Sequence, residues 1–238
     1  MKNNRLWVQN KDTLELRQAT KSFEADLSVI NLAFDFDGVI TSPQGYKASI
    51  LSEMGYDINP EDTANKFALK KMGQQRPELS AKEIKRDYNE MIDLLYVDRI
   101  LDIPAEVGAI EVMKKYCENE RYNVYIVTSR YANSERPQVQ AAGKWLQKKG
   151  ISIDGLIHTD EQNKQQDLAK MRPAIYVDDS IKKLYELFED QECTMLPGEI
   201  ADTKIIHFRQ VANAHESVRG KILQVNSWYT IDKLVREG

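Results

Sequence analysis

The chain has 238 residues, enough for one α/β domain with an inserted subdomain or for two small domains. Its 42% hydrophobic and 29% charged residues are typical of a soluble globular protein, and its two cysteines have no metal-ligand spacing. The net charge of −4 argues against a broad nucleic-acid-binding surface. The N-terminus has no signal-peptide core, and no apolar stretch approaches the ~18 residues of a membrane span. We therefore expect a cytoplasmic protein that binds no membrane.

The first predicted elements are strands. Arg5–Gln9 and Leu14–Arg17 flank a polar turn and predict a β-hairpin. The apolar run Val29–Phe36 contains a single acid and predicts a buried, parallel strand.

The stretch 41–102 is predicted to be helical throughout. Pro60, placed at a first helical position, and the capping box Ser80-x-x-Glu83 are both helix starts. The helices are expected over 47–54, 60–73 and 80–99.

Beyond residue 103, strands alternate with helices. The strands are expected over 123–128, 156–158, 174–179 and 204–208, and the helices over 104–117, 134–149, 163–171, 181–188 and 228–236. This order predicts an α/β fold, a Rossmann-like parallel sheet with helices on both faces. The helical stretch interrupts the alternation, so we interpret 41–102 as a small α-helical cap inserted into a core formed by 1–40 and 103–238.

Two carboxylates end the first core strand. Asp35 and Asp37 are spaced i, i+2, so they point to the same side of the strand, and Gly38 lets the chain leave it through an unusual backbone conformation. Such acids repel each other unless a cation or a proton lies between them. The pattern indicates a divalent-metal site that carries a carboxylate nucleophile.

Two further strands are predicted to deliver polar groups to the same edge of the sheet. One ends in Thr128-Ser129-Arg130 and the other in Asp178-Asp179. The mutual repulsion of four neighbouring carboxylates must be offset by positive charge, because like charges ~4 Å apart repel by about 4 kcal/mol at an effective dielectric near 20. Mg²⁺ or a nearby lysine would supply it.

The motifs resemble those of the haloacid-dehalogenase superfamily, whose members are mostly Mg²⁺-dependent phosphatases. The first motif, Asp-x-Asp-Gly after an apolar strand, is matched by Leu32–Ile40. The second, a strand ending in Thr or Ser, is matched by Val124–Thr128, and the fourth, a strand ending in paired acids, by Ala174–Asp179. The third motif is a lone lysine at a helix start, and it is weakly specified.

The resemblance implies a role for each matched acid. Asp35 would attack phosphorus and form an aspartyl-phosphate, and Asp37 would act as general acid and then as general base. Mg²⁺ would be held by the Asp35 carboxylate, the Asp37 backbone carbonyl and an acid of the fourth motif. Asp179 is the first choice for that acid, since related sequences carry Gly-Asp there. Asp178 would then contact the ligands of the metal, or the metal itself through a water molecule, without binding it directly.

The remaining site candidates bind phosphate or substrate. The resemblance implies that Thr128 hydrogen-bonds a phosphoryl oxygen, with Ser129 beside it. Arg130 could reach an anionic substrate or form a surface ion pair. Lys164 opens its predicted helix and is the first choice for the active-site lysine, and Lys170 at the end of that helix is the alternative.

The predicted function is a Mg²⁺-dependent phosphatase that hydrolyses a small phosphomonoester, such as a nucleotide or a sugar phosphate. An acid at position 37 favours phosphoryl transfer, since the family's dehalogenases lack it. A cap that shuts out water favours small phosphorylated substrates. The alternatives are a polynucleotide end phosphatase and a non-catalytic binding module with the same fold.

Overall fold

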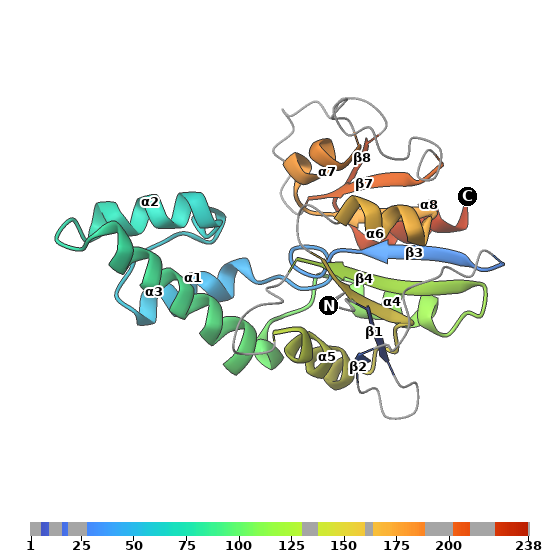
Figure 1. Cartoon of the computed structure of the whole chain (residues 1–238), viewed down its shortest axis with the longest axis horizontal. Coiled ribbons are helices and arrows are strands. Elements are labelled where there is room, and N and C mark those ends of the chain that lie inside the picture. Colours follow the sequence, from blue (N-terminus) through green and yellow to red (C-terminus); the bar gives the residue numbers. More distant parts are fainter. Residues whose placement is uncertain are drawn as a thin grey trace.

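The computed structural model describes residues 6–9, 16–18, 28–129, 138–159, 164–188, 202–209 and 222–237. Within these residues eight strands form one sheet in the order β2-β1-β5-β4-β3-β6-β7-β8 (Figure 1). The strands are β1 (Leu6–Gln9), β2 (Leu16–Gln18), β3 (Ile30–Phe34), β4 (Tyr122–Thr128), β5 (Gly155–His158), β6 (Ile175–Asp178), β7 (Lys204–Phe208) and β8 (Ile222–Val225).

Neighbouring strands from β5 through β8 all pair in parallel. The predicted hairpin, β1 with β2, is antiparallel and adds to the sheet through an antiparallel pairing of β1 with β5. β3 lies in the middle, with four of its five residues fully buried in the run Asn31–Phe34. A central strand has both faces covered, which explains its unbroken apolar sequence.

Helices cover both faces of the sheet, as predicted. On one face pack α4 (Ala109–Cys117), α5 (Gln138–Lys149) and α8 (Trp228–Arg236), which share an apolar core with Phe34. On the other pack α6 (Lys164–Met171) and α7 (Ile181–Phe188), which share a second core with Ala33. In the described part of the chain, no helix has the length and apolar character needed to cross a membrane.

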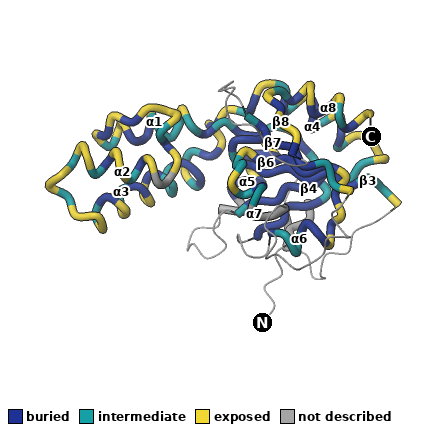
Figure 2. Tube along the Cα trace, turned by 90° about the horizontal axis from the view of Figure 1, so that it is seen from above, coloured by how far each residue is buried: buried dark blue, intermediate teal, exposed yellow. Residues whose placement is uncertain are grey.

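The segment between β3 and α4 is helical and projects beyond one end of the sheet (Figures 1 and 2). It comprises α1 (Gln44–Glu53), a 3₁₀ turn (Pro60–Asp62), α2 (Asn65–Gln75), α3 (Ala81–Asp93), a π turn (Leu94–Asp98) and a 3₁₀ turn (Ile100–Asp102). The predicted capping box opens α3: Glu83 N donates to Ser80 Oγ at 3.3 Å, and Ser80 N donates to Glu83 Oε2 at 2.8 Å. The interpretation of this segment as a cap over the site stays a prediction.

The two connections between the helical segment and the sheet run side by side. Ser42 N donates to Pro104 O at 2.8 Å, and Glu106 N donates to Ile40 O at 2.9 Å. Two buried indoles also donate to these connections. Trp228 Nε1 donates to a backbone carbonyl of the connection that leaves β3, at 2.8 Å, and Trp145 Nε1 donates to one of the connection that leads back to α4, at 2.9 Å. These hydrogen bonds fix the chain where it leaves and re-enters the core.

Several predicted boundaries were wrong. The helix expected over 60–73 is a 3₁₀ turn followed by a separate helix, because Ala64 between them is extended, and Gly73 lies inside α2 instead of ending it. The helix expected from Pro104 starts only at Ala109, because Pro104 belongs to the paired connection and Gly108 takes a left-handed conformation with φ +82°.

Other differences concern single elements. The helix expected over 80–99 ends at Asp93 and continues as a π turn. β8 was not predicted, because two of its four residues are exposed and polar–apolar alternation is absent. Residues 134–137 and 163 of two expected helices lie outside the described residues.

Candidate active site

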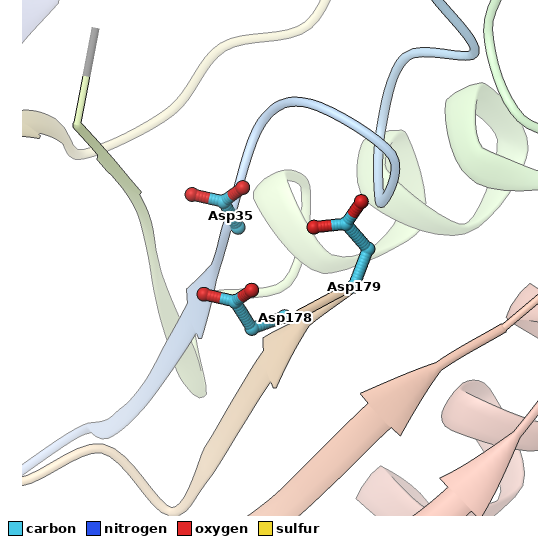
Figure 3. A group of neighbouring side chains, drawn as sticks. All are labelled: Asp35, Asp178 and Asp179. Atoms are coloured by element: carbon cyan, nitrogen blue, oxygen red, sulfur yellow. The ribbon is translucent and has the colours of Figure 1, made fainter. Parts of the chain in front are cut away.

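Three adjacent strands bring acids and a hydroxyl to one edge of the sheet. Asp35 follows β3 directly, Asp178 ends β6 with Asp179 next, and Thr128 ends β4. Because β3 lies between β4 and β6 in a parallel arrangement, these carboxyl ends are neighbours. One carboxylate oxygen from each of Asp35, Asp178 and Asp179 lies within 4.8 Å of the others (Figure 3). Ligands of open α/β sheets bind at this edge.

A buried lysine lies against two of these acids. Lys164, the first residue of α6, places Nζ 2.7 Å from Asp178 Oδ2 and 3.3 Å from Asp35 Oδ1. Burial acts to lower the pKa of Lys164, but the charges of Asp178 and Asp35 outweigh it and hold that pKa above its usual range, so the ammonium stays charged. Lys170, the alternative candidate, is exposed at the other end of the helix.

Asp178 is fully buried and has a donor for each oxygen. Lys164 Nζ and the Tyr176 hydroxyl, the latter at 2.5 Å, both donate to Oδ2, and Ser180 N donates to Oδ1 at 2.9 Å. Burial alone would raise the pKa of Asp178, but the Lys164 charge, a contribution from Lys183 and these hydrogen bonds hold that pKa below its usual range. Asp178 is therefore an ionised, well-satisfied carboxylate.

The ionised forms of Asp35 and Asp179 are disfavoured in this site. Burial raises the pKa of Asp35 to about 6, against the opposing attraction of Lys164. The pKa of Asp179 also lies well above its usual range, because surrounding protein limits its hydration and because Asp178 and Asp35 repel its charge. Asp179 is an exposed residue, so we attribute its raised pKa mainly to the neighbouring charges of Asp178 and Asp35. A cation bound between the carboxylates of Asp35 and Asp179 would stabilise their ionised forms, as in metal sites built from oxygen ligands.

The loop after β3 closes over Asp179. Gly38 has φ +74°, and its N–H donates to Thr41 O at 2.8 Å. Thr41 Oγ1 lies 3.4 Å from Asp37 Oδ1, to which it donates. The half-buried Asp37 thus lies in the same loop, while its side chain is outside the group of three acids whose oxygens converge.

Thr128 is buried at the end of β4, where it lies in register with His158. Its carbonyl accepts a hydrogen bond from Thr159 N at 3.0 Å. The half-buried Ser129 follows, and Arg130 lies outside the described residues. The structure therefore brings Thr128 to the edge that carries the acids, and phosphate contact by Thr128, Ser129 and Arg130 stays a prediction.

Three residues near the acids were not predicted. Tyr176 donates to Asp178, Lys183 contributes positive charge to Asp35 and Asp178, and His207 Nε2 lies 3.1 Å from the Asp179 carbonyl oxygen. A signal existed for Tyr176, since residues i and i+2 of a strand point to one face. No such spacing predicts His207, because its place near Asp179 depends on β7 lying beside β6 in the sheet.

Comparisons with known proteins agree with this architecture. No protein-family profile and no curated protein matches the chain. Among solved structures, a haloacid-dehalogenase-like family protein from Streptococcus pneumoniae has a TM-score of 0.54 and 12% identity, covering 90% of this chain and 100% of that one. A subfamily IA superfamily hydrolase from Geobacter sulfurreducens has a TM-score of 0.52 and 13% identity, covering 90% and 100%.

An L-2-haloacid dehalogenase from Xanthobacter autotrophicus is similar in fold as well, with a TM-score of 0.51 and 9% identity over 87% of this chain and 98% of that one. The chain therefore has the fold of the haloacid-dehalogenase superfamily, with a Rossmann-like core and a helical segment inserted after the first core strand. Its converging acids lie where that fold's parallel strands end.

Proposed function

We propose that the protein is a phosphatase that hydrolyses small phosphomonoesters in the presence of Mg²⁺. The observation that carries the proposal is the contact of a buried lysine, Lys164, with both Asp35 and Asp178, next to Asp179. This arrangement offers a nucleophile, a fixed positive charge and spare carboxylate oxygens in one place. The fold of the solved haloacid-dehalogenase-like hydrolases supports hydrolysis as the general class.

Asp35 would be the nucleophile. With a pKa of about 6 its carboxyl is mostly ionised at neutral pH, and Lys164 favours that form. A carboxylate oxygen would bond to phosphorus as the phosphorus–oxygen bond to the alcohol breaks, giving an aspartyl-phosphate and an alcoholate that takes up a proton. Water would then attack phosphorus, release inorganic phosphate and restore Asp35.

Asp37 would move the protons of both steps. Asp37 lies two residues after Asp35, and its side chain accepts a hydrogen bond from Thr41 in the same loop. This position supports a role beside the leaving oxygen. In its acid form it would protonate the departing alcohol, and in its anionic form it would take a proton from the attacking water. A halide needs no proton, so an acid here favours phosphate esters over the haloacids named for one of the structural relatives.

The donor set fits Mg²⁺. Three carboxylates offer oxygens within 4.8 Å of one another, and burial together with the neighbouring acids raises the pKa values of Asp35 and Asp179. Asp35, Asp179 and the backbone carbonyl of Asp37 would hold the ion, with Asp178 engaged by Lys164 instead. When bound, the metal would neutralise charge on the phosphoryl oxygens.

The experiment measures phosphate released from a generic aryl phosphate and a panel of phosphorylated metabolites, with Mg²⁺ and with chelator. We expect Mg²⁺-dependent release that Asp35→Asn abolishes. Asp202→Asn, which removes an exposed acid at the opposite edge of the sheet, is expected to retain it. Equal activity of wild type and Asp35→Asn would overturn the proposal, as would halide release from 2-chloropropionate without any phosphatase activity.

A further inference from the structure

Tyr176 has an unusual place in the site. It is a fully buried tyrosine in the middle of β6, two residues before Asp178 and on the same face of the strand. Its hydroxyl donates to Asp178 Oδ2 at 2.5 Å. Burial and the nearby acids raise the pKa of Tyr176 well above its usual range, so the hydroxyl keeps its proton and acts as a permanent donor.

The same ring also lies beneath the lysine. Nζ of Lys164 is 5.3 Å from the Tyr176 ring centroid, within the range of a cation–π contact. Lys164 is 98% buried at its side chain, since only 2% of its surface is exposed. Tyr176 therefore contacts both members of the ion pair, the carboxylate through its hydroxyl and the ammonium through its face.

These contacts give Asp178, the last residue of β6, and Asp179, which follows it, different surroundings. Both oxygens of Asp178 are occupied by Lys164, Tyr176 and Ser180 N. Asp179, the next residue, is exposed, and the hydrogen bond it receives from His207 among the described residues goes to its backbone carbonyl. Asp178 is thus turned toward the lysine, and Asp179 is turned toward the space where an ion would bind.

We propose that Tyr176 is a positioning residue that fixes Lys164 against the nucleophile Asp35 by holding Asp178 in one orientation. The role rests on the proposed phosphatase function. Without the hydroxyl, the Asp178 carboxylate loses one of two donors on Oδ2, keeps Lys164 Nζ and Ser180 N, and is held less rigidly. The ammonium would then spend less time at Asp35 Oδ1, from which it lies 3.3 Å.

The kinetic experiment compares Tyr176→Phe with the wild type using an aryl phosphate as substrate. We expect kcat to fall about tenfold or more, the scale seen when a supporting partner of an active-site group is lost. KM and the Mg²⁺ concentration for half-maximal activity should stay within about twofold, because Tyr176 touches neither substrate nor metal. Tyr116→Phe, which removes a hydroxyl equally buried on the other face of the sheet, is the matched control and should keep full activity.

Two results would overturn the proposal: an unchanged kcat in Tyr176→Phe, or a kcat restored to the wild-type value by excess Mg²⁺. The second would mean that Asp178 binds the metal directly. Circular dichroism of both tyrosine variants checks that they fold.

A second measurement needs no enzyme activity. Labelling with acetic anhydride, read peptide by peptide, compares the modification rate of Lys164 with that of the exposed Lys170 in the same molecule. We expect Lys164 to be protected in the wild type and labelled several-fold faster in Tyr176→Phe; equal protection in both would overturn the support role. If the wild type hydrolyses no phosphate ester, the proposed function fails, and the labelling still decides whether Tyr176 holds Lys164.

Discussion

Gly38 lies directly against the carboxylate of Asp179. A Cβ at position 38 would lie 2.1 Å from Asp179 Oδ2, far too close for a carbon and an oxygen that are not bonded to each other. Gly38 also has φ +74°, a conformation that residues with side chains rarely adopt. The missing side chain therefore lets the loop that follows β3 close over the acid that follows β6.

The first prediction concerns this contact. Gly38→Ala should lower the free energy of unfolding by about 1–3 kcal/mol, since the new methyl group must displace Asp179 or the loop. Phosphatase activity and its response to Mg²⁺ should be lost together. Urea unfolding and phosphate release measure both effects.

Gly45→Ala is the matched control, because Gly45 is exposed in α1 and a Cβ there meets no atom within 4 Å. This variant should be as stable as the wild type or more stable by about 0.5–1 kcal/mol. Equal stability and activity in the wild type and Gly38→Ala would show that the loop can move without consequence.

The second prediction concerns the buried ion pair. Lys164→Met roughly keeps the length of the side chain but removes the ammonium that contacts both Asp178 and Asp35. Removal of one partner from a buried pair costs about 3–5 kcal/mol of stability. We also expect kcat to fall, while Lys170→Met, at an exposed position of the same helix, stays within about 0.5 kcal/mol of the wild type. A larger effect at Lys170 would assign the lysine role to that residue.

The third prediction is a pH dependence located at the base of the helical segment. Glu106 is 3% exposed, and burial raises its pKa to about 7, with a hydrogen bond from Ser42 acting in the opposite direction. The folded state therefore binds this proton more tightly than the unfolded chain. The free energy of unfolding should fall as the pH rises from about 4.5 to about 7, by roughly 1–3 kcal/mol, and stay level above that.

Glu106→Gln should flatten this part of the pH profile, because glutamine does not titrate. Glu118→Gln, at an exposed position just after α4, should retain the slope of the wild type. Urea unfolding at several pH values measures all three proteins. A slope unchanged in Glu106→Gln would assign the dependence to other groups.

The position of the acids could be predicted from the sequence because it depends only on the shared direction of parallel strands. Asp35, Thr128 and Asp178 each follow an apolar run, and the carboxyl ends of adjacent parallel strands share one edge. The fold class followed from the same alternation of strands and helices.

Side-chain geometry could not be predicted in this way. Lys164 and Lys170 stand at opposite ends of one short helix, and only the packing of α6 against β6 decides which end meets the acids. The start of α4 depended on a pairing between Ser42 and Pro104, two residues far apart in the sequence. Such long-range contacts leave no periodic pattern in the chain.

The most direct test of the proposed chemistry traps the intermediate. Asp37→Asn removes the proposed general base, so turnover should fall by about 10²–10⁴ while attack on an aryl phosphate with a good leaving group continues. After incubation with that substrate and Mg²⁺, mass spectrometry of the peptides should find one phosphoryl group on Asp35 of Asp37→Asn and none on Asp35→Asn. Phosphate release by the wild type, with no phosphoryl group on Asp35 in the Asp37→Asn protein, would contradict the aspartyl-phosphate mechanism.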